Sequence, residues 1–374
     1  MTFRHAPLSI PARLKLLICA VVFLFGAQIA DAQIRTVLVS PTPGNSVASG
    51  TTLRNALAAI PSPSSTDRWL VKIEPGIYDI GATSLQMRSW VDMEGSGIGV
   101  TTIHGSVDMP FLGTINGADN AELRLLTVEA ASANAIAMSN TSVSPRLYRV
   151  KFTASGLAAW GIRNFGSAPQ IEECEIITTS SGGTGSVAYG VVFRDYAYSG
   201  VRSSILRSKI SVSGGATNYG VYMQDGQTVT LIRNSQVTVN GGATTYGIYA
   251  IQSGTWTGQE NLQIRDSEIS SFGGSSASYG MKLETGTSVA FDINGSKVWG
   301  HIAPTTYGLM QLGTAPIGLQ GASVVGFTKT IQTAGSISIA STFLNGGPVT
   351  ASGWVGCMGV WDENGIFYAN SCPP

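Results

Sequence analysis

Short stretches of the chain alternate in a way that is typical of β-strands. Val221-Tyr222-Met223 and Ile248-Tyr249-Ala250 each follow a Tyr-Gly pair, and their local period is two residues. A period of two places successive side chains on opposite faces of a strand, whereas a helix needs a period near 3.6. The phrases around these strands, SGGATNYGVYMQD and NGGATTYGIYAIQ, are nearly the same and begin 27 residues apart. The pattern therefore predicts strands that recur as a repeat.

Two phrases mark the repeat. The first is an aromatic-Gly-apolar triplet, which recurs every 27 to 33 residues at Trp160-Gly161-Ile162, Tyr189-Gly190-Val191, Tyr219-Gly220-Val221, Tyr246-Gly247-Ile248, Tyr279-Gly280-Met281 and Tyr307-Gly308-Leu309. The second alternates with it, as in ILRSKI from Ile205 and IRNSQV from Ile232. Repeats of this length are typical of solenoids, in which each unit buries its apolar face only by stacking on its neighbours.

The residues between these strands predict which solenoid forms. Asn234, Asp266 and Gly295 occupy equivalent positions, and these residue types accept the left-handed conformation of a tight turn. We therefore predict an all-β fold, a single-stranded right-handed parallel β-helix of about ten coils. Stacking would form an inward aliphatic ladder of Ile171, Ile205, Ile232, Ile264 and Ile293. It would also form a hydroxyl ladder of Ser208, Ser235, Ser267, Ser296 and Ser323, with Cys174 as a small buried thiol at the equivalent position of the preceding coil.

Both ends of such a solenoid need a cover, because a terminal coil exposes unpaired backbone and apolar core. Residues 51 to 60 place Leu53, Leu57 and Ile60 on one helical face and predict a cap helix. We assign residues 33 to 68 to an N-terminal segment with this helix, 69 to 343 to the coils, and 344 to 374 to a C-terminal hairpin closed by a Cys357–Cys372 disulfide.

Residues 1 to 32 read as a secretory signal peptide. A basic start precedes the apolar run from Leu16 to Gly26, and Ala30-Asp31-Ala32 is a small-x-small cleavage site. We expect cleavage after Ala32 and a secreted or periplasmic protein. No other apolar run approaches the length needed to span a membrane.

The charge balance limits the partners. The full chain has 22 basic and 22 acidic residues. The signal segment contains three of the basic and one of the acidic residues, so 19 basic and 21 acidic residues remain after cleavage. A slightly negative chain argues against a nucleic-acid partner. Charged residues make up 12% of the chain, and 46 of its 374 residues are glycine, which suits stacked short strands.

The N-terminal half resembles a known group of β-helix proteins. A short cap helix, then VKIEPGIYDI, VDMEGSGIGVTTI and NFGSAPQIEECEI, resembles the pectin lyase-like superfamily, and within it the pectin methylesterases most, over residues 50 to 180. The resemblance implies the fold, but the methylesterase residues are absent. Leu157 and Ile162 stand where two catalytic aspartates belong, Asn134 stands in place of a glutamine, and Ile80 in place of a glutamate. Esterase activity of that kind therefore has no nucleophile.

Other catalytic arrangements are also lacking. A polygalacturonase-like hydrolase would need clustered aspartates around a Gly-His-Gly, whereas His104 and His301 are better explained as turn residues. The sequence has no Ser-His-Asp spacing, metal-ligand cluster or phosphate loop. It predicts no cofactor and no metal, and it assigns no oligomeric state.

Stacking could still bring polar residues together. Asp195 and Asp225 each lie five residues after a repeat glycine, and a pair of carboxylates about 5 Å apart would suit a retaining glycosidase. The alternative is a pair of solvated acids at strand ends. Arg233 and Arg265 are also equivalent and could grip an anionic group, unless they pair with nearby acids.

The tyrosines are the most regular candidates. The row from Trp160 to Tyr307 shares the parity of the apolar residue after the glycine, so it is expected to point inward or fill a corner. Tyr222 and Tyr249 have the opposite parity. They are expected to face outward as a platform for a sugar ring, with Gln252 and Asp225 nearby.

Three hypotheses follow for function. The first is a secreted, non-catalytic protein that binds a polysaccharide or a cell-surface glycan. The second is a polysaccharide hydrolase or lyase that uses carboxylates from stacked coils such as Asp195 and Asp225. The third is a structural adhesin without a sugar site.

Overall fold

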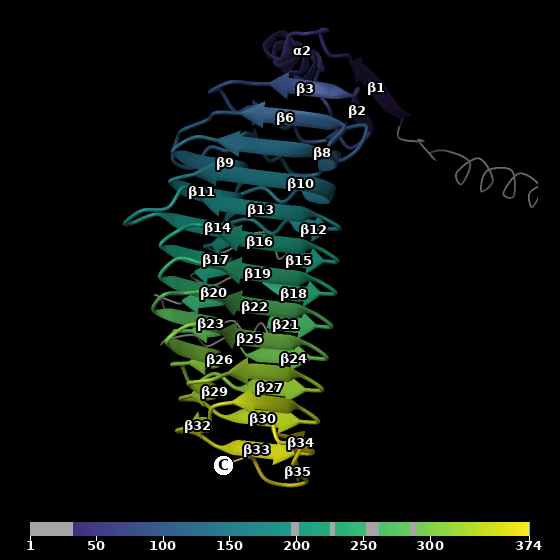
Figure 1. The fold of residues 1–374 in the computed structure, drawn as a ribbon. Coiled ribbons are helices and arrows are strands. Elements are labelled where there is room, and N and C mark those ends of the chain that lie inside the picture. The colour runs from purple at the N-terminus through teal and green to yellow at the C-terminus, as the bar shows by residue number, and fades with distance from the viewer. Residues whose placement is uncertain (1–32, 196–201, 225–228, 252–261, 285–289, 374) are drawn as a thin grey trace, which may run out of the picture.

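The structure is a computed structural model that describes residues 33–195, 202–224, 229–251, 262–284 and 290–373. Within them the chain winds into a right-handed parallel β-helix with one helix at its N-terminal end (Figure 1). The β-helix predicted from the repeat is confirmed. Each central coil contributes three strands, and the third strands form an 11-stranded sheet with one strand per coil.

The strands form three faces. The first face contains β1 (Gln33–Val39), β2 (Asp67–Ile73), β5 (Val91–Glu94), β12 (Gln170–Glu172), β15 (Ser203–Leu206), β18 (Val229–Arg233), β21 (Leu262–Arg265), β24 (Phe291–Asn294), β27 (Ile317–Gln320), β30 (Ile337–Ala340) and β33 (Val355–Met358). The second contains β3 (Gly76–Asp79), β6 (Thr101–Gly105), β13 (Glu175–Ser180), β16 (Lys209–Ser213), β19 (Gln236–Asn240), β22 (Glu268–Phe272), β25 (Lys297–His301), β28 (Ser323–Gly326), β31 (Phe343–Gly346) and β34 (Val360–Trp361). Two long strands, β8 (Glu122–Ala131) and β10 (Arg146–Gly156), belong to both faces.

The third face is the separate 11-stranded sheet. It contains β4 (Leu85–Gln86), β7 (Ile115–Asn116), β9 (Asn134–Thr141), β11 (Ala158–Phe165), β14 (Val187–Arg194), β17 (Thr217–Gln224), β20 (Thr244–Ile251), β23 (Ala277–Leu283), β26 (Thr305–Gln311), β29 (Lys329–Thr333) and β32 (Val349–Ala351).

A tight turn joins the first face to the second in each coil. Asn234, Asp266 and Gly295 have φ values of 50°, 48° and 57° there, so the left-handed turn predicted for these positions is confirmed. Inside the turn, the backbone N–H of Ser208 donates to Ser235 Oγ at 3.1 Å, and that of Ser235 donates to Ser267 Oγ at 3.2 Å. Each hydroxyl thus satisfies the backbone of the preceding coil.

The hydroxyl ladder is one coil shorter than predicted. Ser323 pairs with Lys297 in β25, so Ala322 takes the position that Ser296 holds in the coil before. At the other end, Cys174 N–H donates to Ser208 Oγ at 3.1 Å, and the Cys174 side chain is buried and unbridged. Burial raises the pKa of the Cys174 thiol to about 12, which fits an unreactive packing residue.

The core runs along the solenoid axis. The predicted ladder of Ile171, Ile205, Ile232, Ile264 and Ile293 is fully buried, with each residue opposite the next in the strand pairing. The N-terminal end of this core is covered by α2 (Ser46–Ala59), which begins earlier than predicted because Asn45 Oδ1 accepts the N–H of Ala48 and caps it. Leu53, Leu57 and Ile60 are buried beneath it, as their spacing indicated.

The C-terminal end is closed by a hairpin. Parallel pairing continues beyond residue 343 through β31, β33 and β34, after which β35 (Phe367–Tyr368) turns back in antiparallel pairing with β34. The predicted disulfide is present: Cys357 in β33 is joined to Cys372, with their Cα atoms 5.1 Å apart. The last parallel coil is therefore tied covalently to the chain end that covers it.

Replacing Cys357 and Cys372 together by serine should lower the free energy of unfolding by about 3 kcal/mol, because the disulfide restricts the loop that it closes in the unfolded chain. The loss should appear first as faster amide hydrogen exchange in β33. Urea unfolding of the oxidised, reduced and doubly substituted proteins measures it. Equal stability of all three would show that the hairpin does not secure the last coil.

Candidate functional site

Two rows of aromatic side chains lie on the outer surface of the third face. In β17, Tyr219 and Tyr222 are half-buried whereas Gly220 and Val221 between them are buried, so the strict alternation of a strand is broken there. A Cβ built on Gly220 would lie 2.3 Å from Val237 Cγ1, which places this glycine against the interior. The prediction that Tyr219 and its equivalents point inward is therefore wrong. The glycine reverses the parity, and both tyrosines point out.

The first row is a continuous stack of rings. Successive centroids from Trp160 to Tyr307 are 4.9 to 5.7 Å apart, with interplanar angles of 3° to 10°. The second row contains Tyr222 and Tyr249, whose centroids are 5.5 Å apart at 19°. Tyr222 also meets Tyr219 edge to face at 5.2 Å. Burial in this stack raises the pKa of Tyr189 to about 12 and that of Tyr246 to about 12, so these phenols stay neutral in the physiological range.

The structure brings Tyr222 and Tyr249 together on the surface, as predicted, but their rings stack on each other and do not form one flat platform. Their rings face each other, and their hydroxyls are engaged: Tyr222 Oη donates to Gln224 Oε1 at 3.1 Å and Tyr249 Oη to Glu284 Oε1 at 3.0 Å. A sugar ring therefore cannot lie across both aromatic faces at once. Gln252 and Asp225, the predicted neighbours of this platform, lie outside the described residues.

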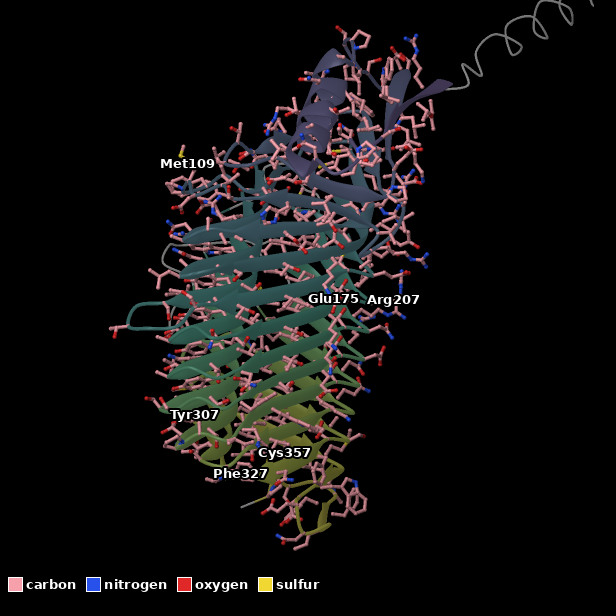
Figure 2. All side chains as sticks on the ribbon, turned by 45° about the horizontal axis from the view of Figure 1, so that its top comes forward. Met109, Glu175, Arg207, Tyr307, Phe327 and Cys357 are labelled. Atoms are coloured by element: carbon pink, nitrogen blue, oxygen red, sulfur yellow. A yellow bond between two sulfur atoms is a disulfide. The ribbon has the colours of Figure 1, made fainter. Side chains whose placement is uncertain are left out.

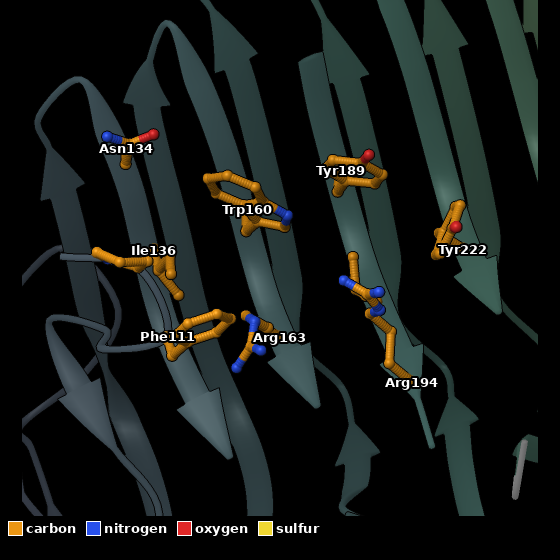
Figure 3. Close-up of a pocket in the computed structure, with 10 residues that line it drawn as sticks. Phe111, Asn134, Ile136, Trp160, Arg163, Tyr189, Arg194 and Tyr222 are labelled. Atoms are coloured by element: carbon orange, nitrogen blue, oxygen red, sulfur yellow. The ribbon is translucent and has the colours of Figure 1, made fainter. Parts of the chain in front are cut away.

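A pocket opens just before the first ring of the second row. In the strand register Val192 stands between Arg163 of the preceding coil and Tyr222 of the next, and its short side chain leaves a recess. The recess has a volume of about 170 Å³. It is lined by Pro110, Phe111, Asn134, Ile136, Trp160, Arg163, Tyr189, Val192, Arg194 and Tyr222 (Figure 3). Aromatic surface and polar side chains thus converge on one small space.

Arg163 is the unusual residue of this pocket. Its side chain is only 6% exposed, and its Nη1 has no hydrogen-bond partner in the described part of the chain. Its guanidinium carbon lies 4.7 Å from the centroid of the Phe111 ring and 5.4 Å from that of Phe165. Burial, and then the positive charge of Arg194, lower the pKa of Arg163. The pocket therefore holds a cation that lies against two aromatic rings and has no ion-pair partner among the described residues.

Asn134 and Asp195 lie at the borders of the pocket region. Asn134 lines the pocket, and its backbone N–H and Nδ2 donate to Asp108 Oδ1 at 2.8 and 2.9 Å. Asp195 directly follows β14, is half-buried and has φ 59°. Its predicted partner Asp225 lies outside the described residues, so the carboxylate pair stays a prediction.

The arginines Arg233 and Arg265 lie on a different face. They are opposite each other in the pairing of β18 with β21, as their equivalence predicted, and both are exposed. Within the described ranges neither forms an ion pair, whereas Arg207 on the same side of the molecule pairs with Glu172 and Glu173. Figure 2 shows Arg207 and Tyr307 on different sides of the solenoid. Arg233 and Arg265 therefore do not contribute to the aromatic pocket.

Sequence reasoning missed Arg163, Arg194 and Phe111. A signal existed for Arg163, because it stands three residues after the aromatic of its triplet, where later coils have Val192, Tyr222 and Tyr249. Phe111 gave none, because its loop precedes the repeat. Among the described residues, no group of three potential metal ligands occurs, and no helix is both long and apolar enough to cross a membrane.

No family model and no curated protein matches this chain. Among solved structures, it is similar to the catalytic domain of a GH87 α-1,3-glucanase in complex with nigerose, with 12% identity, a TM-score of 0.43, and coverage of 85% of this chain and 65% of that domain. The catalytic unit of the GH87 α-1,3-glucanase from Streptomyces thermodiastaticus strain HF3-3 is 15% identical, with a TM-score of 0.44 and coverage of 89% of this chain and 67% of that one. The A-module of the Azotobacter vinelandii mannuronan C-5 epimerase AlgE6 is 13% identical, with a TM-score of 0.32 and coverage of 88% of this chain and 97% of that module.

The chain thus spans slightly less than two thirds of the first glucanase domain. Likenesses at these identities and TM-scores say nothing about the activity of this chain.

Proposed function

We propose that this protein is an exported, non-catalytic β-helix that binds a glycan in the pocket on its third face. The observation that carries the proposal is the convergence of Trp160, Tyr189 and Tyr222 on one recess of about 170 Å³. Aromatic rings provide apolar surface for the C–H face of a sugar, and Asn134 and Arg194 offer hydrogen-bond donors at the rim. Export is supported by the signal-like residues 1 to 32 and by the disulfide.

The position of the pocket in the stack explains why it suits a ligand. Between coils, the faces of the ring stack are already covered by neighbouring rings. Trp160 is the first ring of its row, and Tyr222 is the first ring of the second row. Both first rings line the recess, and Ile136 stands opposite Trp160 in the strand pairing in place of a further ring. A recess of this size fits a single sugar unit, so we expect weak binding that several contacts along a chain would strengthen.

Binding is favoured over hydrolysis by the residues in the pocket. Glycoside hydrolysis commonly uses two carboxyl groups on either side of the scissile bond. The residues known to line the recess include no carboxylate. The methylesterase positions do not supply one either, since Leu157 is exposed and Ile162 is buried in the core. An enzyme would instead have to use Asp195 with Asp225, and a structural adhesin would need no pocket.

Replacing Trp160 by alanine should weaken binding about fivefold, and the Trp160→Ala, Tyr222→Ala double variant should lose retention altogether, because each ring contributes roughly 1 kcal/mol of contact. Affinity electrophoresis in gels that contain pectin, alginate, xylan or α-1,3-glucan measures the retention. Tyr307→Ala is the matched control, since Tyr307 ends the same row far from the recess. Thermal unfolding of each variant checks that the fold is kept.

Two results would contradict the proposal. Retention of the double variant equal to that of the wild type would remove the pocket as the binding site. Release of reducing ends or unsaturated products by the wild type, abolished in an Asp195→Asn, Asp225→Asn variant, would make the protein an enzyme.

A further inference from the structure

The buried guanidinium of Arg163 indicates what kind of glycan the pocket takes. A buried charge is normally paired, because removing it from water without a counter-ion is strongly unfavourable. Arg163 forms no ion pair and no hydrogen bond to a side chain in the described ranges, and its Nη1 is fully enclosed without a partner. Stacking on Phe111 and Phe165 compensates part of this cost, but Nη1 still has no hydrogen-bond partner among the described residues.

The surroundings of Arg163 add to the positive potential. Arg194, from the next coil, lines the same pocket and forms no ion pair among the residues described. Asp195 is the acidic residue whose charge acts on Arg163, and its effect is smaller than that of Arg194. Two guanidinium groups therefore flank one recess whose known lining contains no acid (Figure 3). Such a recess attracts an anion.

We propose that the pocket binds a sugar unit that carries one anionic group, a carboxylate or a sulfate ester, which accepts hydrogen bonds from Arg163 and Arg194. This inference rests on the proposed glycan-binding function and specifies its ligand. Planar guanidinium donors match the oxygens of a carboxylate or sulfate in a bidentate manner. Trp160, from the same strand as Arg163, and Tyr222, from two coils further on, line the same recess and would hold the sugar ring, so one unit would satisfy both parts of the pocket.

The test compares acidic sugars with a neutral ester of one of them. Trigalacturonate, its fully methyl-esterified form and a sulfated galactan oligosaccharide of similar length are titrated into the full chain by calorimetry. The wild type should bind an acidic probe at least about tenfold more tightly than the ester, because a hydrogen bond to a charged group is worth that factor or more. This preference for the acidic probe should shrink as salt rises from about 50 to about 500 mM, because salt screens the attraction between the arginines and the anionic group.

Variants of Arg163 locate the effect. Arg163→Met should reduce affinity for the acidic probe to that for the ester, and Arg163→Lys should recover part of it, because the charge returns without the planar donors. Arg149→Met is the control: it removes one positive charge from the turn between the first two faces, where Arg149 pairs with Glu173. Whichever acidic probe binds more tightly identifies the anionic group. If Arg163→Met does not fold, the acid-to-ester comparison on the wild type still decides.

Equal binding of acid and ester by the wild type, or unchanged affinity in Arg163→Met, would overturn the inference while leaving a neutral glycan site in place. Absence of binding to every glycan would instead refute the proposed function, and this inference with it.

Discussion

Replacing Gly220 by alanine should lower the free energy of unfolding by about 3 kcal/mol or more, because the third face has no room for a methyl group at this position. The added Cβ would lie 2.3 Å from Val237 Cγ1 and 2.4 Å from the carbonyl oxygen of Gly247 in the next coil. The carbonyl belongs to a paired strand, so it cannot move without disturbing the pairing of β17 with β20. Alanine is a better strand residue than glycine, so propensity alone predicts the opposite sign.

Gly318→Ala is the matched control for this prediction. Gly318 lies in β27, and the nearest atom to its Cβ position is Asp292 Oδ1 at 3.6 Å, an ordinary contact distance. Alanine should be neutral or slightly stabilising there. Urea unfolding followed by far-UV circular dichroism measures both variants. A Gly220→Ala protein as stable as Gly318→Ala would show that the backbone at the aromatic triplet can move apart from its neighbours.

Replacing Ile232 by alanine should also cost about 3 kcal/mol, because it leaves a cavity in a fully buried ladder. Ile232 is opposite Ile205 on one side and Ile264 on the other. Since a solenoid coil contacts only its neighbours, the effect should couple strongly to the adjacent coil. The Ile232→Ala, Ile264→Ala double variant should therefore depart from additivity by 0.5 kcal/mol or more, in the range seen for residues in contact.

The pair Ile232→Ala with Ile293→Ala supplies the comparison. Ile293 lies two coils from Ile232 and pairs with Ile264, so the two substitutions share no direct contact and should be nearly additive. Equilibrium unfolding of the single and double variants gives both coupling energies. Equal coupling in the two pairs would contradict a core built from nearest-neighbour contacts.

The sequence predicted the features that each coil repeats. Residue alternation identified strands, the triplet spacing identified coils, and Asn234, Asp266 and Gly295 identified the turn, because each depends on a few neighbouring residues and recurs many times. The cap helix followed from the spacing of Leu53, Leu57 and Ile60. The bond between Cys357 and Cys372 followed from their close spacing, read together with the signal-like residues 1 to 32.

Only the tertiary structure decided where the side chains of the third face point and what they enclose. The alternation of a regular strand would place Tyr219 on the same side as Val221. Gly220 is buried as well as Val221, however, so the tyrosine points outward. The pocket depends on Val192 being shorter than Tyr222 in the next coil, and on the Phe111 loop folding over Arg163. Local sequence therefore determined the coil, whereas the site arises from differences between coils that become neighbours only when the solenoid stacks.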